Sequence, residues 1–412
     1  MTWIGIDMSE SGGVAVLVGT GEEAEKYWEF ENTPQGRRTW LEELACFDEV
    51  HLVLETTESF SERIAEEAIA RGFRVYVVST NALKSFRKLE GYEDKNDSLD
   101  ALLLGRMGHR GLRSVRPAVI FDAACAELRG LARLRRRLVG LRTELGQQLR
   151  AGLLRLSPEI ASATWEGPKP TSRTFLAVLE RWPDLVSLQR AQRRTVVQLV
   201  RKVGRYSEAR ANEIAECLQQ WAREVGGMAP SRRDVTTLEL RLLRENLGLQ
   251  NQQIRSLDRQ IRERVLGHPR GPALLEMPGI GFIVAAWLLA EALPRAQSAT
   301  EGQLATYSGL TPASRDSGRS KRSRLRRSVN RRLASTYFTS AVASLKDESL
   351  DRDYYEKKKA EFHGHPAAHV KAVIALARQR HKVIYKILRG ETRYSEIKLA
   401  RTTLSRARDR AA

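Results

Sequence analysis

The amino-acid sequence predicts an α/β domain over residues 1–115, followed by a mainly α-helical remainder. In the first part, short apolar runs alternate with helical patterns, whereas leucines further along recur every three or four residues. The charge is divided in the same way: the net charge of the 412 residues is +19, but residues 1–100 carry 10 basic and 21 acidic side chains. The remaining residues therefore carry +30. Since a single core rarely extends beyond about 250–300 residues, we expect more than one domain.

The order of elements in the first domain narrows its fold. Three strands come first, and helices then alternate with two more strands. This is the order of a ribonuclease-H-like fold, and a flavodoxin-like fold is the alternative that the pattern leaves open. Strands are expected at 3–7, 13–18, 26–30, 50–55 and 73–78, and helices at 36–46 and 62–71.

Long amphipathic helices are expected after the α/β domain. Leucines at helical spacing, with arginines between them, predict a basic helix over 123–155, and a second such helix is expected over 240–261. The pair could form an antiparallel hairpin or a dimer seam. Residues 158–170 are expected to be a loop and 174–225 further helices, and a compact helical module is expected after residue 268.

Charge and cysteine content restrict the class of protein. A basic body indicates a polyanionic partner, most simply nucleic acid. The content of 42% hydrophobic and 29% charged residues excludes wholesale disorder. Three widely spaced cysteines match no metal-binding pattern and are typical of a reducing cytosol. An acid at position 7 argues against a signal peptide, and no apolar run approaches the ~18 residues of a membrane span.

Four carboxylates are candidates for a metal site. Asp7 ends the first expected strand, Glu55 ends the fourth, and Asp97 and Asp100 share one face at the start of a helix. Strand-end acids meet at the carboxyl edge of an α/β sheet, where ligands bind. Each acid alone has an ordinary structural explanation as a cap or a strand end, but together they favour a site for Mg²⁺ or Mn²⁺. Such ions can activate an attacking oxygen on a phosphodiester.

The C-terminal module contains two phosphate-binding candidates. Residues 277–286 have the form of a helix-hairpin-helix turn, whose glycines let backbone amides approach a phosphate. Residues 311–340 hold nine basic side chains and one acidic side chain, together with several serines. From composition alone, a Ser/Arg-rich loop binds phosphate rather than acting as a nucleophile. The expected nucleic-acid-binding residues are Gly279, Gly281, Arg319, Lys321, Arg322, Arg324, Arg326, Arg327, Arg331 and Arg332.

The ordered motifs resemble a known family. Asp7, Glu55 and Lys95-x-Asp97-x-x-Asp100-Ala101 are followed by Pro278-Gly279-Ile280-Gly281, then by Tyr307-x-Gly309-Leu310-x-Pro312 and Ser317-Gly318. In this order they are similar to the DEDD-serine transposases, the bridge-RNA-guided insertion-sequence recombinases related to Piv-type DNA invertases. The resemblance covers both ends of the chain but not residues 156–235.

The resemblance implies both an architecture and a mechanism. It implies a RuvC-like domain (1–115), a helical coiled-coil region (116–268, with an insert near 156–235), a transposase domain (269–395) and a basic tail (396–412). Asp7, Glu55, Asp97 and Asp100 would bind the metal ions, and Ser317 would form a covalent phosphoserine link to DNA. Implied partners are donor and target DNA, a noncoding guide RNA, and further copies of the chain in a dimer or tetramer. A bacterial, cytoplasmic and nucleoid-associated location follows.

Two other functions remain open from the sequence. The same tetrad would serve a nuclease or junction resolvase that uses water as the nucleophile, and the acids of a non-catalytic nucleic-acid-binding protein would be structural. Within the transposase interpretation, Ser314 and Ser320 compete with Ser317 for the role of nucleophile, because the family often has Ser-Gly-Gly where this chain has Ser-Gly-Arg.

Overall fold

The computed structural model divides the chain into two compact units, Met1–Ile120 and Phe121–Ala412. It describes residues 1–55, 60–119, 121–162, 165–183, 185–226, 230–317, 320–324, 326, 329–346 and 350–395, with only the backbone at 230, 232–233, 314–317 and 320–324.

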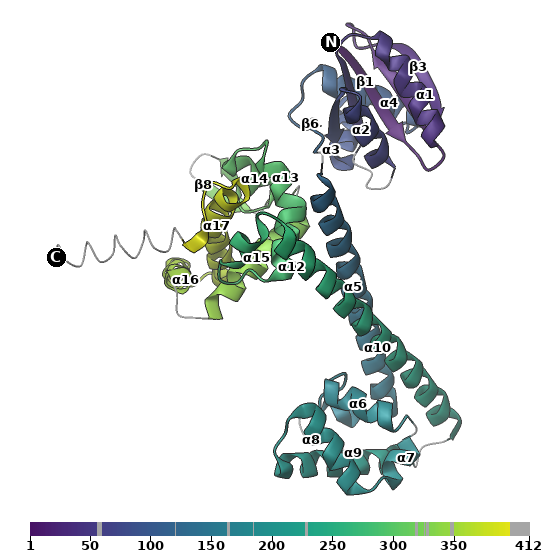
Figure 1. Ribbon diagram of the computed structural model, residues 1–412, viewed down its shortest axis with the longest axis vertical. Coiled ribbons are helices and arrows are strands. Elements are labelled where there is room, and N and C mark those ends of the chain that lie inside the picture. Colours follow the sequence, from purple (N-terminus) through teal and green to yellow (C-terminus); the bar gives the residue numbers. More distant parts are fainter. Residues whose placement is uncertain are drawn as a thin grey trace, which may run out of the picture. The chain divides into compact units, whose positions relative to one another are not determined.

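Unit 1 is built on a six-stranded sheet with the order β3-β2-β1-β4-β5-β6 (Figure 1). The first three strands are antiparallel, β1, β4 and β5 are parallel, and β6 returns antiparallel to β5. Strands expected at five places are confirmed, whereas the two-residue β6 has no apolar pattern to predict it. The strands are β1 (Thr2–Met8), β2 (Gly12–Val18), β3 (Ala24–Glu31), β4 (Val50–Glu55), β5 (Arg74–Val78) and β6 (Arg116–Pro117).

Helices cover both faces of this sheet. One core joins the sheet to α1 (Pro34–Glu43), the 3-10 turn η1 (Leu44–Cys46) and α2 (Ser61–Ala70). The other joins it to α3 (Thr80–Leu89) and α4 (Asp97–His109). Helix α3 was not predicted from the sequence, because only Leu83 and Phe86 of this basic helix are buried.

Two long helices of unit 2 lie side by side, although they are far apart in the sequence (Figure 1). These are α5 (Ala123–Leu156) and α10 (Pro230–Gly267), and they confirm the two long amphipathic helices expected from leucine spacing. Between them, η2 (Pro158–Ala161), α6 (Arg173–Arg181), α7 (Leu185–Arg190), α8 (Arg193–Gly204) and α9 (Glu208–Gly226) share a core with the adjoining ends of α5 and α10.

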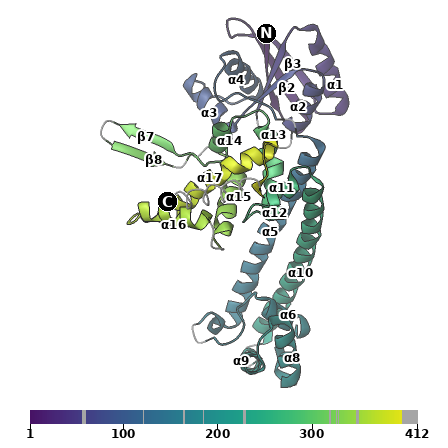
Figure 2. The same ribbon diagram turned by 60° about the vertical axis from the view of Figure 1, so that its left-hand side comes forward.

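The C-terminal part of unit 2 is a second helical core that includes the start of α5. It contains a π-helix, η3, and also a two-stranded ribbon within the segment expected to be a Ser/Arg-rich loop (Figure 2). The ribbon was not predicted, because its polar sequence shows no alternation of apolar and polar residues. The elements are α11 (Gly271–Leu275), α12 (Phe282–Trp287), η3 (Leu288–Ala292), α13 (Leu293–Ala296), α14 (Glu301–Tyr307), β7 (Ala313–Ser317), β8 (Ser320–Arg324), α15 (Arg331–Ala343), η4 (Ser344–Lys346), α16 (Leu350–Glu361) and α17 (Ala368–Arg389).

Candidate active site

Asp7 and Glu55 leave two neighbouring parallel strands at the same edge of the sheet. Ile6 of β1 is in register with Leu54 of β4, so the residues that follow them, Asp7 and Glu55, come next to each other. Both carboxylates are half-buried. The carboxyl edge of the parallel strands therefore holds two acids, as the sequence predicts.

The first turn of α4 supplies the other two acids. The Asn96 side chain caps this helix by accepting a hydrogen bond from the Leu99 amide (2.7 Å), and Asp97 and Asp100 follow in the first turn. Carboxylates at this end of a helix are stabilised by its dipole. Asp97 is exposed, whereas Asp100 is 2% exposed.

The Asp7 carboxyl group is affected by its burial and by the charges of the other three candidates. The pKa of Asp7 is raised from 3.8 to about 7. Burial is the largest cause, followed by repulsion from the negative charges of Asp97, Asp100 and Glu55, while Lys95 opposes the shift. Without a bound cation, Asp7 is therefore about half protonated near neutral pH.

Asp100 has a cationic partner that the sequence analysis missed. Arg87 of α3 forms a hydrogen-bonded ion pair with the Asp100 carboxylate, and their side chains are 12% and 3% exposed. The pair neutralises one of the four acids. No local sequence signal reveals it, because the two residues lie on different helices.

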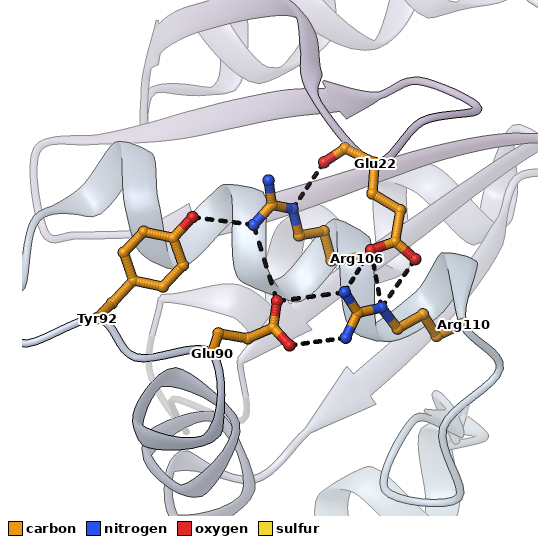
Figure 3. A network of polar contacts seen from close by, with 5 residues as sticks. All are labelled: Glu22, Glu90, Tyr92, Arg106 and Arg110. Atoms are coloured by element: carbon orange, nitrogen blue, oxygen red, sulfur yellow. Dashed lines mark hydrogen bonds and ion pairs between the residues drawn. The ribbon is translucent and has the colours of Figure 1, made fainter.

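A polar network fixes α4 at its other end (Figure 3). Arg110 donates to both carboxylate oxygens of Glu22 (2.8 Å each) and to Glu90 (2.7 Å). Arg106 donates to the carbonyl oxygen of Glu22 (2.6 Å) and to the hydroxyl of Tyr92 (3.1 Å). The network joins α4 to the β2–β3 turn and to the segment after α3, so it restricts the position from which Asp97 and Asp100 approach β1.

A cavity of about 310 Å³ opens beside Asp7 and Asp97. Its wall includes the β1–β2 turn and the first residues of β2, Gly12 and Gly13, which pack closely against Phe30: a Cβ on Gly13 would lie 2.4 Å from the Phe30 ring. Glu29 and Glu31 of β3 add two more acids to its lining. The cavity is thus strongly acidic and suits a cation more than a bare phosphate.

The chemistry of the donor set fits a hard divalent cation. All four candidates offer carboxylate oxygens, which is the donor type that such cations prefer. The pKa of Asp7 is raised by burial and then by neighbouring negative charge, and a cation would offset that charge. The four acids therefore fit a cation in charge and donor type, although among the residues that the structure describes no three acidic, histidine or cysteine side chains stand close enough together to hold an ion as they are.

The two glycines of the expected helix-hairpin-helix turn have different surroundings. At Gly279, with φ +76°, a Cβ would lie 2.4 Å from the Ser340 carbonyl oxygen and 2.7 Å from the Ser344 amide. This glycine is needed because the turn packs against α15. Nothing lies within 4 Å of a Cβ at Gly281, which precedes α12.

The candidate nucleophiles lie on the β7–β8 ribbon. Ser317 pairs with Ser320 at the end of the ladder, and Ser314 pairs with Ser323 nearer its base. Arg326 and Arg331 are exposed and Arg332 is half-buried. Lys321, Arg322 and Arg324 lie on β8. Gly318, Arg319, Arg327 and the expected basic tail at 396–412 lie outside the described residues.

Comparison with known proteins defines the class. A family profile described as a transposase, for the DEDD domain of IS110, matches residues 4–158, and a second described as "Transposase IS116/IS110/IS902 family" matches residues 271–356. The protein is thus a transposase, an enzyme that cuts and recombines DNA, with DNA as its substrate. The DEDD domain suggests dependence on a divalent metal.

Relatives along most of the chain identify the family. The chain is 31% identical to the insertion element IS900 42 kDa protein of Mycobacterium paratuberculosis, covering 73% of each chain. It is 28% identical to the IS110 43.6 kDa protein of Streptomyces coelicolor (88% of this chain, 87% of the relative). It is 26% identical to the IS116 44.8 kDa protein of Streptomyces clavuligerus (94% and 95%). The chain belongs to the IS110/IS116/IS902 family of insertion-sequence transposases. Of the helices described, none is both long and apolar enough to cross a membrane.

Proposed function

We propose that this transposase breaks DNA strands with Ser317 as the nucleophile, assisted by divalent metal ions at Asp7, Glu55, Asp97 and Asp100. The placement of the acids carries the proposal: Asp7 and Glu55 lie next to each other at one edge of the sheet, and Asp97 lines a cavity together with Asp7. Burial, and then the charges of Asp97, Asp100 and Glu55, raise the pKa of Asp7 in agreement with this placement. Structural acids with ordinary capping roles would have no reason to converge. The family excludes the non-catalytic alternative, because its members are transposases.

The finer architecture belongs to the same proposal. The strand order β3-β2-β1-β4-β5 supports a RuvC-like, ribonuclease-H-like domain at 1–115. The packing of α5 against α10 supports a coiled-coil arm within 116–268 that carries the insert near 156–235. A transposase domain at 269–395 with a helix-hairpin-helix-like turn and a basic tail at 396–412 complete the chain.

The tetrad would hold Mg²⁺ or Mn²⁺. Such ions polarise the scissile phosphate and stabilise the charge that develops on its oxygens. The protein's own contribution is to hold the acids in place: Asn96 orders the first turn of α4, and Arg87 fixes Asp100. The acidic cavity beside Asp7 disfavours a phosphate when no cation is present.

The serine step transfers a phosphoryl group without net hydrolysis. The Oγ atom of Ser317 loses its proton and forms a bond to phosphorus, and the bond from phosphorus to the leaving deoxyribose oxygen breaks. That oxygen takes up a proton, and the protein stays linked to the other DNA end. The register supports Ser317 or Ser320 over Ser314, because these two flank the tip of the ribbon. We choose Ser317 because Gly318 follows it, as in the family motif.

Nucleic-acid binding is assigned to the basic part of the chain. The net charge of +30 beyond residue 100 supports binding of DNA, and of a guide RNA, through Lys321, Arg322, Arg324, Arg326, Arg331 and Arg332, with Arg319, Arg327 and the turn at Gly279 and Gly281. We further propose a dimer or tetramer in which the tetrad and the serine of different copies complete one site.

A covalent-trapping experiment tests the proposal. Wild-type protein with its RNA, insertion-element ends and Mg²⁺ or Mn²⁺ should yield protein–DNA adducts that resist denaturation, whereas Asp97→Ala and Ser317→Ala should yield none but still bind DNA. A mixture of the two variants should regain some activity if copies share a site. Strand cleavage without any adduct would instead support the metal-bound-water alternative.

A further inference from the structure

The segment that contains the β7–β8 ribbon is closed by hydrogen bonds between two residues that flank it, Tyr307 and Asn330. On the side that enters the ribbon stands Tyr307, the last residue of α14, and on the side that leaves it stands Asn330. The Asn330 amide donates to the Tyr307 carbonyl oxygen (2.8 Å), and its side-chain Nδ2 donates to the Tyr307 hydroxyl (3.0 Å). The two ends of the segment are therefore tied together by backbone and side chain.

Asn330 also makes two further kinds of contact. Its Oδ1 accepts hydrogen bonds from the amides of Arg332 (3.0 Å) and Leu333 (3.1 Å), which caps α15. Its Nδ2 donates to Oε2 of Glu291 (3.0 Å). One side chain thus joins the base of the ribbon, the start of α15 and the π-helix.

Glu291 is the centre of this cluster. It is 5% exposed and lies in the π-helix η3, a rare form that is common at functional sites. Its Oε1 faces Arg133 (3.2 Å), Arg129 (3.8 Å) and Arg332 (3.8 Å). Two of these arginines belong to α5, so the carboxylate connects the ribbon's base to the long helix. Its charge is well compensated, which favours a fixed position.

A two-stranded ribbon has little stability of its own, so its direction depends on how its base is held. Attack on a phosphate is sensitive to position, and an error of 1 Å can cost about 100-fold in rate. The cluster described above is what holds this base.

We propose that Glu291 and Asn330 are positioning residues for strand cleavage: through Tyr307 they hold the base of the β7–β8 ribbon so that Ser317 reaches the scissile phosphate. This inference rests on the proposed role of Ser317. Glu291 and Asn330 would affect the rate of the covalent step without contacting DNA themselves.

Variants at position 330 distinguish two roles of Asn330: its hydrogen bonds to Glu291 and Tyr307, and its capping of α15. Asn330→Ser and Asn330→Asp keep an oxygen that caps α15 but remove the donor to Glu291 and Tyr307, and the aspartate adds repulsion from Glu291. Both should slow adduct formation at saturating DNA by about 10- to 100-fold, with the DNA Kd near wild type. Both should also lower Tm, because buried Glu291 loses a hydrogen-bond donor. Tyr307→Phe removes a single hydroxyl and should give a smaller loss in the same direction. Tyr355→Phe is the matched control, since Tyr355 bonds to His369 on the α16–α17 side of the core.

A reciprocal exchange tests the contact itself. In the double variant Glu291→Gln with Asn330→Asp, the glutamine amide can donate to the new carboxylate, so donor and acceptor are swapped and the charge is kept. The double variant should recover much of the rate that Asn330→Asp loses, which a general loss of folding would not allow.

The outcomes separate this inference from the proposed function. If wild-type protein forms no adduct through Ser317, both fall. If wild-type protein forms the adduct through Ser317, and the position-330 variants and Tyr307→Phe form it at the wild-type rate, the positioning role of Glu291 and Asn330 is wrong while the role of Ser317 stands. It is also wrong if the reciprocal double variant shows no recovery, or if Tyr355→Phe slows the step as much as Tyr307→Phe.

Discussion

Gly5 of β1 lies directly against Ala101 of α4: a Cβ on Gly5 would stand 1.9 Å from the Ala101 carbonyl oxygen and 2.3 Å from the Gly105 amide. Only a residue without a side chain allows this approach. It brings α4, which carries two aspartates in its first turn, against the strand that contains Asp7. The candidate site thus depends on a packing contact two residues away from its first acid.

Substitution of Gly5 should disrupt the site by moving α4. Gly5→Ala should lower the free energy of unfolding by about 1–3 kcal/mol, because backbone atoms of α4 must give way. Asp97 and Asp100 would then lie further from Asp7, and the pKa of Asp7 should fall because their negative charges repel it less. Urea unfolding and NMR titration of Asp7 measure the two effects. Gly146→Ala is the control, because nothing lies within 4 Å of a Cβ at that helical position, and it should be neutral or stabilising by up to about 1 kcal/mol. Equal behaviour of the two variants would contradict the packing argument.

With divalent ions removed by a chelator, Asp7→Asn should raise the free energy of unfolding at pH values above about 4. Because the folded-state pKa of Asp7 is about 7 against an ordinary 3.8, the folded protein holds a proton that the unfolded chain releases between these values. The contribution of Asp7 to the free energy of unfolding of the wild-type protein therefore decreases as pH rises from about 4 to 7. The asparagine variant has no ionisable group at this position, so its free energy of unfolding does not decrease for this reason. The lowered pKa of buried His51 acts in the opposite sense but is common to both proteins.

Urea unfolding of both proteins from pH 4 to pH 8 measures this difference. The curves should meet near pH 4 and separate by pH 8, and added Mg²⁺ should narrow the gap by binding the ionised acids. Parallel curves across the range would mean that the carboxylates do not interact as described.

Loss of Arg87 should be costly because it leaves Asp100 buried without its partner. We expect Arg87→Ala to lower the free energy of unfolding by about 3–5 kcal/mol in chelator, as for other broken buried pairs. Arg210→Ala removes an exposed pair with Glu213 and should cost less than about 1 kcal/mol. Chemical denaturation compares them directly, and similar losses would show that Asp100 is solvated after all.

Binding to DNA should depend steeply on salt. Arg326→Ala and Arg331→Ala each remove an exposed cation beside the ribbon, so each should flatten the plot of log K against log salt by about 0.9 if it contacts a phosphate. Arg201→Ala, on the exposed face of α8, serves as the control. Fluorescence anisotropy at several salt concentrations gives the slopes, and unchanged slopes for both ribbon variants would remove this segment from the DNA interface.

Much of unit 1 follows from sequence patterns, for reasons visible in particular residues. Val50–Glu55 is apolar except for His51 until its terminal acid, so both the strand and the place of Glu55 at its end are predictable. Asp97 and Asp100 are recognisable because Asn96 and the acids form an N-terminal helix signal. The approach of α4 to β1 at Gly5 is a tertiary effect that spacing does not show.

The features that were not predicted from the sequence depend on contacts between distant segments or on strands without an apolar pattern. Arg87 and Glu291 look like ordinary members of a basic helix and an apolar helix, and only the fold brings them to Asp100 and Asn330. The β7–β8 ribbon is built from serine and arginine, which have no apolar alternation to predict a strand. Hydrogen bonds between Tyr307 and Asn330, which flank the ribbon, join residues 23 positions apart in the sequence.

Peptide mapping of the trapped protein–DNA adduct tests the central claim most directly. Trypsin cuts after Arg315, Arg319 and Lys321, so Ser317 falls in the peptide Asp316–Arg319, apart from Ser314 and Ser320. After nuclease digestion, mass spectrometry should find the nucleotide remnant on the peptide that contains Ser317, and only when divalent metal is present and the tetrad is intact. A remnant on the peptide of Ser314 or Ser320, or cleaved DNA with no remnant on any peptide, would contradict the account.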